Sequence, residues 1–363
     1  MTTITDIVTA DAPEYSARHP TLPTSHHKAI PALRTCRTGH YGYSLYACQP
    51  WGGRHRILHS CGNRHGPPGQ HAKAEQWLHQ QLEKPLPGPS FLIPCTVPET
   101  LRPCCRAHPK PASQALCKAS AEALKRLAHD ARFLGTDLPG FTGILHTWGR
   151  PLPYHPHMHS MVPGGGLSKD RAAWLPARAN FSVPVNALSP ISRAIFAEDM
   201  GTAGLLEPID PQVWQRPWNV QSPATPQRTT AWPYLAPYGF HVAISHRRIV
   251  SLQDRTVTCT SRKSGRARPR TTHLDVLEFL RRSLQHVFPS GCMKVRHCGF
   301  MSTSCASTME AIRRMMPEQT RLAPALPPAR HPPAAAWACP PCGGALLGVC
   351  RVGSSPVALL DTG

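Results

Sequence analysis

One segment, residues 146–166, constrains the fold of this chain more than any other. It reads HTWGRPLPYHPHMHSMVPGGG. His157 and His159 are two residues apart, and in a β-strand that spacing places both imidazoles on one face. The Gly and Pro residues of the intervening loop, 149–153, favour a turn. The segment therefore predicts a hairpin over residues 141–163 with imidazoles gathered on one side.

A hairpin whose loop centres between Pro151 and Leu152 sets His146 opposite His157. Cross-strand partners share a face, so His146, His157 and His159 are expected to converge, with His155 as a spare candidate. Three imidazoles leave open positions for water and phosphate oxygens, as activation of a phosphodiester requires. We expect Mg²⁺ or Mn²⁺ there, although neutral imidazoles favour Mn²⁺, Co²⁺ or Zn²⁺ over Mg²⁺. The alternative is a chance His-x-His pair in a chain with 21 His.

The charge balance points to a polyanionic partner. Forty Lys and Arg face twenty Asp and Glu, a net charge of +20, and cationic side chains that contact phosphates release counterions. Arg262, Lys263 and Arg266 form a basic run that could follow a DNA backbone; a solvated loop is the alternative. A membrane surface is disfavoured, since no basic amphipathic helix dominates and no apolar run could span a bilayer.

The compartment is predicted from the same sequence. The N-terminal residues lack the pattern of a secretory signal, so a cytoplasmic protein is expected. In that compartment the 14 Cys are expected to be thiols or metal ligands rather than disulfides.

A pair of tyrosines provides a second chemical signal. Tyr234 and Tyr238 lie in WPYLAPYGFHVAISHRR, four residues apart, and would share one face of a helix. A phenolate that attacks a phosphodiester forms a phosphotyrosine, which keeps the bond energy for rejoining. Two core-facing tyrosines would explain the pair equally well.

The remaining pattern predicts an α+β protein, because strand and helix signals alternate irregularly. The 41 Pro conflict with regular structure where they fall inside elements. Residues 1–30 are predicted to be a disordered lead. The other expected segments are a short helix near 72–82, a strand over 89–98, helices over 114–134 and 275–288, a Pro-rich stretch over 180–230 and a hairpin over 242–262.

Together these motifs resemble the two-tyrosine HUH transposases of the insertion sequence ninety-one type. The resemblance runs from about Cys36 to Arg314 and rests on HTWG, HPHMH with VPGGG, YLAPY, VAIS with Arg247 and Arg248, and ETLRP at 99–103. It implies an HUH-endonuclease-like antiparallel sheet with flanking helices, and rolling-circle cleavage and rejoining of single-stranded DNA. His157 and His159 would be the metal ligands and Tyr234 and Tyr238 the nucleophiles, while Arg247 and Arg248 would contact DNA.

The same resemblance implies a domain plan. A degenerate zinc-finger-like DNA-binding region would cover residues 31–85 and an HUH-type catalytic domain residues 86–315. Residues 316–363 would form a Pro/Ala-rich tail that carries a lone CxxC knuckle, Cys339 to Cys342, with Cys350 as a third candidate ligand.

The finger departs from the family pattern of C-x₂-C followed by S-C-x-N-R-H-C-P-x-C. Cys48 remains, but its partner position holds Trp51, and residues 66–69 (GPPG) replace C-P-x-C. A structural zinc site needs four N or S ligands. The candidates left are Cys36, Cys48, Cys61 and His65; the alternative is a finger that has lost its zinc.

The tyrosine segment departs as well. Pro237 stands where the family usually has Arg, and it disfavours a helix through Ala236. Three hypotheses follow: a strand-transferring transposase, a catalytically inactive DNA-binding remnant of one, or an unrelated metal hydrolase that uses His155, His157 and His159 without a tyrosine.

Overall fold

The computed structural model describes residues 2–66, 74, 76–81, 86, 90–132, 135–149, 152–177, 185–207, 209–215, 218, 243–261, 268–305, 309–316 and 338–353. The chain forms two compact units, each assembled from separate stretches of sequence. One contains Met1–Lys73, Ile244–Val287 and Leu326–Gly363, and the other contains Ala74–Ala243 and Phe288–Ala325. Both mix helices with antiparallel sheets, which confirms the predicted α+β class.

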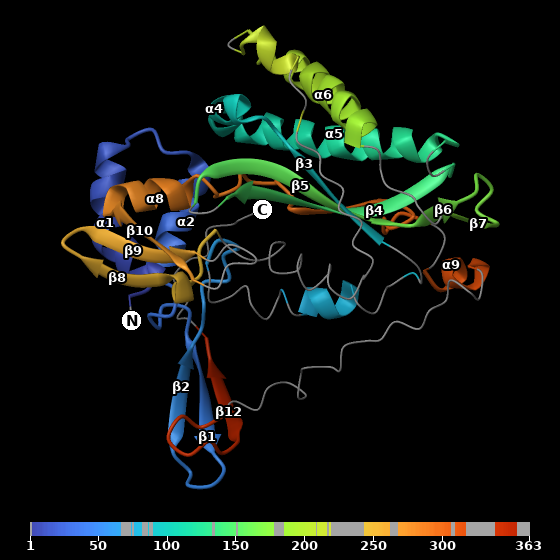
Figure 1. The fold of residues 1–363 in the computed structure, drawn as a ribbon. Helices are drawn as coiled ribbons and strands as arrows, with labels where there is room; N and C mark the ends of the chain where they lie inside the picture. Colours follow the sequence, from blue (N-terminus) through green and yellow to red (C-terminus); the bar gives the residue numbers. More distant parts are fainter. Residues whose placement is uncertain are drawn as a thin grey trace. The chain divides into compact units, whose positions relative to one another are not determined.

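The unit that contains residues 74–243 is built on a six-stranded sheet of order β3-β5-β4-β6-β7, with β11 also paired to β4. Helices α5 and α6 pack against each other along one face of this sheet (Figure 1). The strands are β3 (Ser90–Thr96), β4 (Leu138–Trp148), β5 (Tyr154–Pro163), β6 (Gly165–Leu167), β7 (Trp174–Pro176) and β11 (Val295–Gly299). The helices are η1 (Glu99–Leu101), α4 (Arg102–Ala107), α5 (Pro109–His129), α6 (Val185–Thr202), η2 (Pro211–Trp214) and α9 (Met309–Met315).

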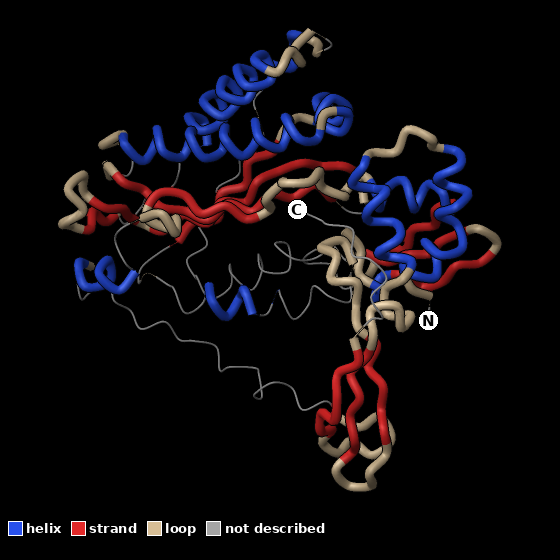
Figure 2. The backbone as a smooth tube through the Cα atoms, turned by 180° about the vertical axis from the view of Figure 1, so that it is seen from behind, coloured by secondary structure: helices blue, strands red, loops and turns tan. Residues whose placement is uncertain are grey.

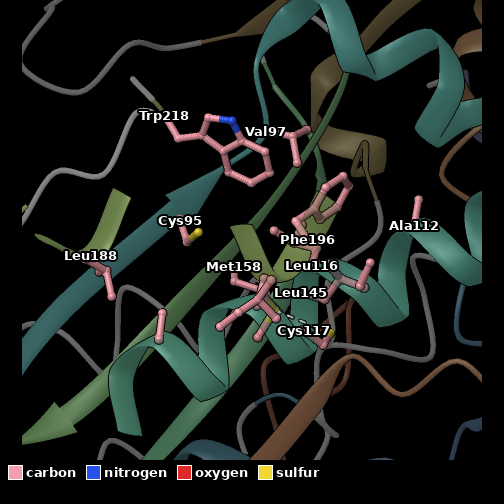
Figure 3. Packing of buried hydrophobic residues seen from close by; sticks show 14 of the residues in the cluster. Cys95, Val97, Ala112, Leu116, Cys117, Leu145, Met158, Leu188, Phe196 and Trp218 are labelled. Carbon is pink, nitrogen blue, oxygen red and sulfur yellow. Dashed lines mark hydrogen bonds between the residues drawn. The ribbon is translucent and has the colours of Figure 1, made fainter. Parts of the chain in front are cut away.

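The core of this unit lies between the sheet and those helices. Leu145 of β4 and Met158 of β5 are opposite each other in the register and point to the same face. They meet Leu116 and Cys117 of α5 and Phe196 of α6 (Figure 3). The Cys117 thiol lies 3.7 Å from the Met158 sulfur. Because side chains alternate along a strand, the residues on either side of Leu145 and Met158 face away from this core.

Several prolines occupy positions that tolerate them. Pro94 lies on β3, which pairs with β5 and stands at the edge of the sheet among the described strands, and an edge strand has no second neighbour that needs the missing N–H. Pro109 begins α5, where its fixed φ suits the first helical turn. Pro13, Pro31 and Pro190 lie inside α1, α2 and α6. The expectation that proline excludes regular structure is therefore wrong at these three positions.

The other unit contains two three-stranded sheets, of order β12-β1-β2 and β10-β9-β8 (Figure 2). Its helices are α1 (Ile4–Arg18), α2 (Thr24–Arg34), η3 (His246–Arg248) and α8 (Val276–Leu284). Its strands are β1 (Tyr43–Cys48), β2 (Arg54–Leu58), β8 (Ile249–Gln253), β9 (Thr256–Ser261), β10 (Arg270–Asp275) and β12 (Leu346–Val352). The hairpin predicted over 242–262 is β8 and β9.

The prediction of a disordered lead over residues 1–30 is wrong. Helix α1 begins with a capping box in which the Thr3 hydroxyl accepts from the Asp6 N–H and the Asp6 carboxylate accepts from the Thr3 N–H. Its apolar residues, among them Ile7 and Val8, are buried, and the helix packs on α2 and α8. Tertiary packing supplies most helix stability, and the contacts with α8 come from residues more than 200 positions away. None of the described helices combines the length and apolar character of a membrane span.

Candidate metal centre

The β4–β5 hairpin brings three histidines together. His146 lies opposite His157 in the register, and His159 lies opposite Ile144, two residues from His146. All three point away from the core face that carries Leu145 and Met158. Their register is therefore the one predicted from the sequence.

The three imidazoles are close enough to bind one ion. One ligand nitrogen from each lies within 4.8 Å of the other two. The ring centroid of His146 lies 4.9 Å from that of His157 and 4.6 Å from that of His159, and the centroids of His157 and His159 are 4.9 Å apart. The rings meet edge to face rather than stacking, so that their nitrogens converge.

Burial keeps these imidazoles neutral. It lowers the pKa of His157 to about 3 and that of His159 to about 4, with neighbouring histidines adding a smaller lowering. The pKa of His146, which is 1% exposed, is also well below its ordinary value, first because of burial and then because of His159 and His157. A neutral imidazole offers the lone pair that a metal requires, so all three are in the binding form at pH 7.

One ring is oriented by the backbone. The Nδ1–H of His157 donates to the carbonyl of His155 at 2.6 Å, which leaves Nε2 facing Nδ1 of His146 at 3.2 Å. Such a hydrogen bond fixes the tautomer and raises the basicity of the other nitrogen. The His155 imidazole is not a member of the convergent group. Its carbonyl oxygen orients His157, and its imidazole lowers the pKa of His159 as a lesser cause after burial.

Two cations act on the cluster, and neither was among the predicted site residues. Arg102 lowers the pKa of His157 and Lys294 lowers that of His146, each as a lesser cause after burial. Lys294 Nζ lies 5.0 Å from the ring centroid of Trp148, which in turn stacks on His146. Arg102 belongs to the ETLRP segment, so this sequence motif could have identified it as a site residue. No sequence motif pointed to Lys294.

The other predicted site residues are only partly within the described part of the chain. Tyr234, Tyr238, Arg262, Lys263 and Arg266 lie outside the described residues. Arg247 is exposed on η3, while Arg248 Nε donates to the Thr260 carbonyl at 2.9 Å.

The predicted zinc set of Cys36, Cys48, Cys61 and His65 is wrong as a group. Cys36 and Cys61 are neighbours, with the Cys61 N–H 3.4 Å from the Cys36 sulfur. Both flank the open end of the β1–β2 hairpin, where Tyr43 pairs with Leu58. Cys48 lies at the opposite, turn end of that hairpin, about 17 Å along the strand at roughly 3.4 Å per residue. It lies instead with Cys339 and Cys342.

Comparisons with known proteins find transposases. Residues 140–308 match a family model described as "Putative transposase", and residues 7–97 match one described as "Transposase zinc-binding domain". The chain is 32% identical over 320 residues to "Putative transposase y4qJ" of Sinorhizobium fredii, covering 82% of this chain and 80% of that protein. It is 28% identical over 153 residues to "Transposase for insertion sequence element IS801" of Pseudomonas savastanoi pv. phaseolicola, covering 40% and 35%. No solved structure matches the chain.

Proposed function

The chain belongs to the IS91-type transposases, and we propose that it cleaves and rejoins single-stranded DNA through a covalent 5′-phosphotyrosine during rolling-circle transposition. The observation that carries this proposal is the convergence of His146, His157 and His159 on one face of a hairpin. The proposal also locates the protein in the cytoplasm, where bacterial DNA is found.

The histidine cluster fits a divalent metal, Mn²⁺ or Mg²⁺. Its donors are three neutral nitrogens that converge within 4.8 Å, and one of them is oriented by a backbone carbonyl. A metal bound there would polarise the scissile phosphate and leave positions open for its oxygens. The protein supplies the arrangement: His157 is held by the His155 carbonyl, and His146 stacks on Trp148.

The nucleophiles in this proposal are Tyr234 and Tyr238. One phenolic oxygen attacks the phosphorus and gives up its proton to a base or water. A P–O bond to tyrosine forms, and the P–O bond to the 3′ oxygen breaks. That oxygen takes a proton and leaves as a 3′-hydroxyl. In rejoining, a 3′-hydroxyl attacks the phosphotyrosine and releases the phenol, so no external nucleotide is consumed.

Cationic side chains would position the DNA strand. Arg102 and Lys294 act electrostatically on the histidine cluster and are proposed to contact the phosphates that flank the cleaved bond. Arg247 and the run of Arg262, Lys263 and Arg266 are proposed to contact phosphates further along the strand. Together they account for part of the net charge of +20.

A catalytically inactive DNA-binding remnant is the competing function. The observation that favours it is Pro237, which lies between the two tyrosines. Proline inside a helix lacks an N–H and costs about 3 kcal/mol or more, so a helix that presents both phenols would be weakened.

A covalent-adduct assay tests the proposal. Labelled single-stranded DNA from the element ends is incubated with protein and Mn²⁺ or Mg²⁺ and run on a denaturing gel. We expect a metal-dependent shifted band that disappears in His157→Ala and in the double Tyr234→Phe, Tyr238→Phe variant. No band from folded, DNA-binding protein would establish the remnant. Cleavage that persists in the double Phe variant would instead indicate a hydrolase.

A further inference from the structure

A second cluster of metal-binding side chains lies outside the histidine centre. It joins Cys48, at the end of β1, to Cys339 and Cys342, which precede β12. The three sulfurs lie within 4.8 Å of one another, and those of Cys48 and Cys342 are 3.4 Å apart. Cys48 and Cys339 are 2% and 1% exposed. The sequence alone gave no reason to pair Cys48 with a knuckle almost 300 residues away.

A nitrogen donor lies beside the sulfurs. Nε2 of His55, on β2, is 3.3 Å from the Cys339 sulfur. The register explains the position, because β1 pairs with β2 on one side and β12 on the other, which places His55 opposite Tyr46 and Cys48 opposite Leu346. Three sulfurs and one imidazole form a donor set that Zn²⁺ takes in structural sites.

Two of the ligand separations agree with tetrahedral zinc. Zn–S bonds of about 2.3 Å and Zn–N bonds of about 2.0–2.1 Å separate two sulfurs by about 3.8 Å and a sulfur from a nitrogen by about 3.5 Å. The observed separations of 3.4 Å between Cys48 and Cys342 and 3.3 Å between Cys339 and His55 are within a few tenths of an ångström of those values.

The surroundings of the sulfurs are those of a metal knuckle. The Trp51 Nε1–H donates to the Cys339 sulfur at 3.4 Å, and the Gly344 N–H donates to the Cys342 sulfur at 3.4 Å. Gly343 adopts φ +70, and a Cβ on Gly344 would meet Pro50 at 2.5 Å. Both glycines are thus required by the fold of the knuckle. Trp51 stands where the family pattern has a thiolate ligand. Its indole N–H instead donates to the sulfur of a ligand, Cys339.

We propose that Cys48, Cys339, Cys342 and His55 bind a structural Zn²⁺ that fastens the C-terminal strand β12 to the N-terminal β1–β2 hairpin. His55 lies beside one of the sulfurs, that of Cys339, and would complete the coordination as the fourth ligand. Among the residues that the structure describes, the buried apolar cluster around the site consists of Cys48, Cys339 and Leu346, with Tyr46 packed against it. So small a core needs a metal for stability, and binding free energy then becomes folding free energy.

Cobalt substitution of the full-length protein tests this site without DNA or activity. Thiolate-to-cobalt charge-transfer bands report sulfur ligands, so the histidine centre does not contribute to them. We expect these bands in the wild type, and their loss together with one equivalent of zinc in Cys339→Ser and Cys342→Ser. His55→Ala should weaken zinc affinity by more than the roughly 10–100-fold that loss of an outer-shell partner costs. His55→Cys should retain zinc with a stronger charge-transfer band.

The matched controls are Cys350→Ser, an exposed thiol on β12, and Cys36→Ser, a buried thiol at the other end of the hairpin. Both should retain the zinc and the bands. Three results would overturn the proposal: bands that survive Cys339→Ser, bands that depend on Cys36 instead, or a Cys48–Cys342 disulfide in unreduced peptides. Because none of these readouts involves DNA cleavage, they are independent of the transposase mechanism.

Discussion

At the scale of single residues, the proposed metal centre depends on which nitrogen each imidazole leaves available. His157 has its Nδ1–H committed to the His155 carbonyl, so its Nε2 faces His146. His155 therefore orients a ligand through its backbone, although its side chain has the same parity on the strand as His157 and His159. Parity alone makes all three histidines equivalent; the predicted register set His155 aside as a spare candidate, but no sequence pattern predicted the role of its carbonyl.

This distinction gives a prediction about metal affinity. His157→Ala removes a ligand and should weaken Mn²⁺ binding by more than the roughly 10–100-fold expected for an outer-shell loss. His155→Ala keeps the carbonyl that accepts from His157 and should change the affinity far less. Titration followed by the Mn²⁺ electron paramagnetic resonance signal measures both. Equal losses in the two variants would contradict the assignment.

A half-buried histidine in the other unit, His26, should make stability sensitive to acid. Burial, with a smaller lowering from His27, brings the pKa of His26 from 6.5 down to about 4. The unfolded chain thus binds the proton more readily, and stability present above pH 6.5 is lost as the pH falls toward 4. In urea titrations, His26→Gln should lose less stability than the wild type between pH 7 and 4.5. The exposed His40→Gln should behave like the wild type, and parallel pH profiles for all three proteins would refute this origin.

At the scale of elements, local signals predicted much of the fold. The alternation of His146, His157 and His159 predicted the β4–β5 hairpin, and Asp275 marked the start of α8 because a short carboxylate suits a helix N-cap. Helix α5 begins at Pro109, five residues before the predicted start, because proline suits a first turn. Helix α1 was missed because Pro13 and a polar composition weaken the local pattern; contacts with α8 compensate for that weakness.

The cap of α8 gives a prediction about stability. The Asp275 carboxylate accepts from the N–H groups of Leu277 and Glu278 at 2.9 and 3.4 Å. Asp275→Ala leaves both donors without this acceptor and should lower the free energy of unfolding by about 0.5–2 kcal/mol. Asp275→Asn keeps a capping oxygen, so its free energy of unfolding should be close to that of the wild type. Denaturant titration of the two variants decides the point, and an equal loss in both would exclude the cap as the cause.

The packing of α6 on the sheet gives a larger effect. Phe196 is fully buried against Trp218 and the sheet core (Figure 3). Phe196→Ala should lower the free energy of unfolding by about 3–5 kcal/mol, because it removes apolar burial and leaves a cavity. Met293→Ala is the control, since that side chain is 60% exposed. Tryptophan fluorescence during denaturation measures both, and a loss below about 1 kcal/mol in Phe196→Ala would show that the helix is not held by this contact.

At the scale of the whole molecule, neither compact unit is a continuous stretch of sequence. Strand β12 comes from the C-terminal part of the chain and completes the sheet of β1 and β2, while β8 to α8 come from the middle. The predicted boundaries at residues 30, 85 and 315 followed composition and motif order along the chain. They could not anticipate that Cys48 meets Cys342 or that α1 packs on α8, because pairings over such separations leave no local periodicity.

This discontinuity predicts the effect of removing the C-terminal segment. A chain that ends at Ala325 retains Cys48 and His55 but lacks Cys339, Cys342 and β12. We expect it to lose the thiolate-bound zinc, and β1 to become an unprotected edge whose amides exchange faster. Amides of β4 and β5 should keep their protection, because their unit contains its own core. Hydrogen exchange resolved by mass spectrometry compares the two sheets directly. Unchanged protection in β1 would mean that the hairpin folds without its C-terminal strand, whereas loss of protection in both sheets would mean that the two units fold as one.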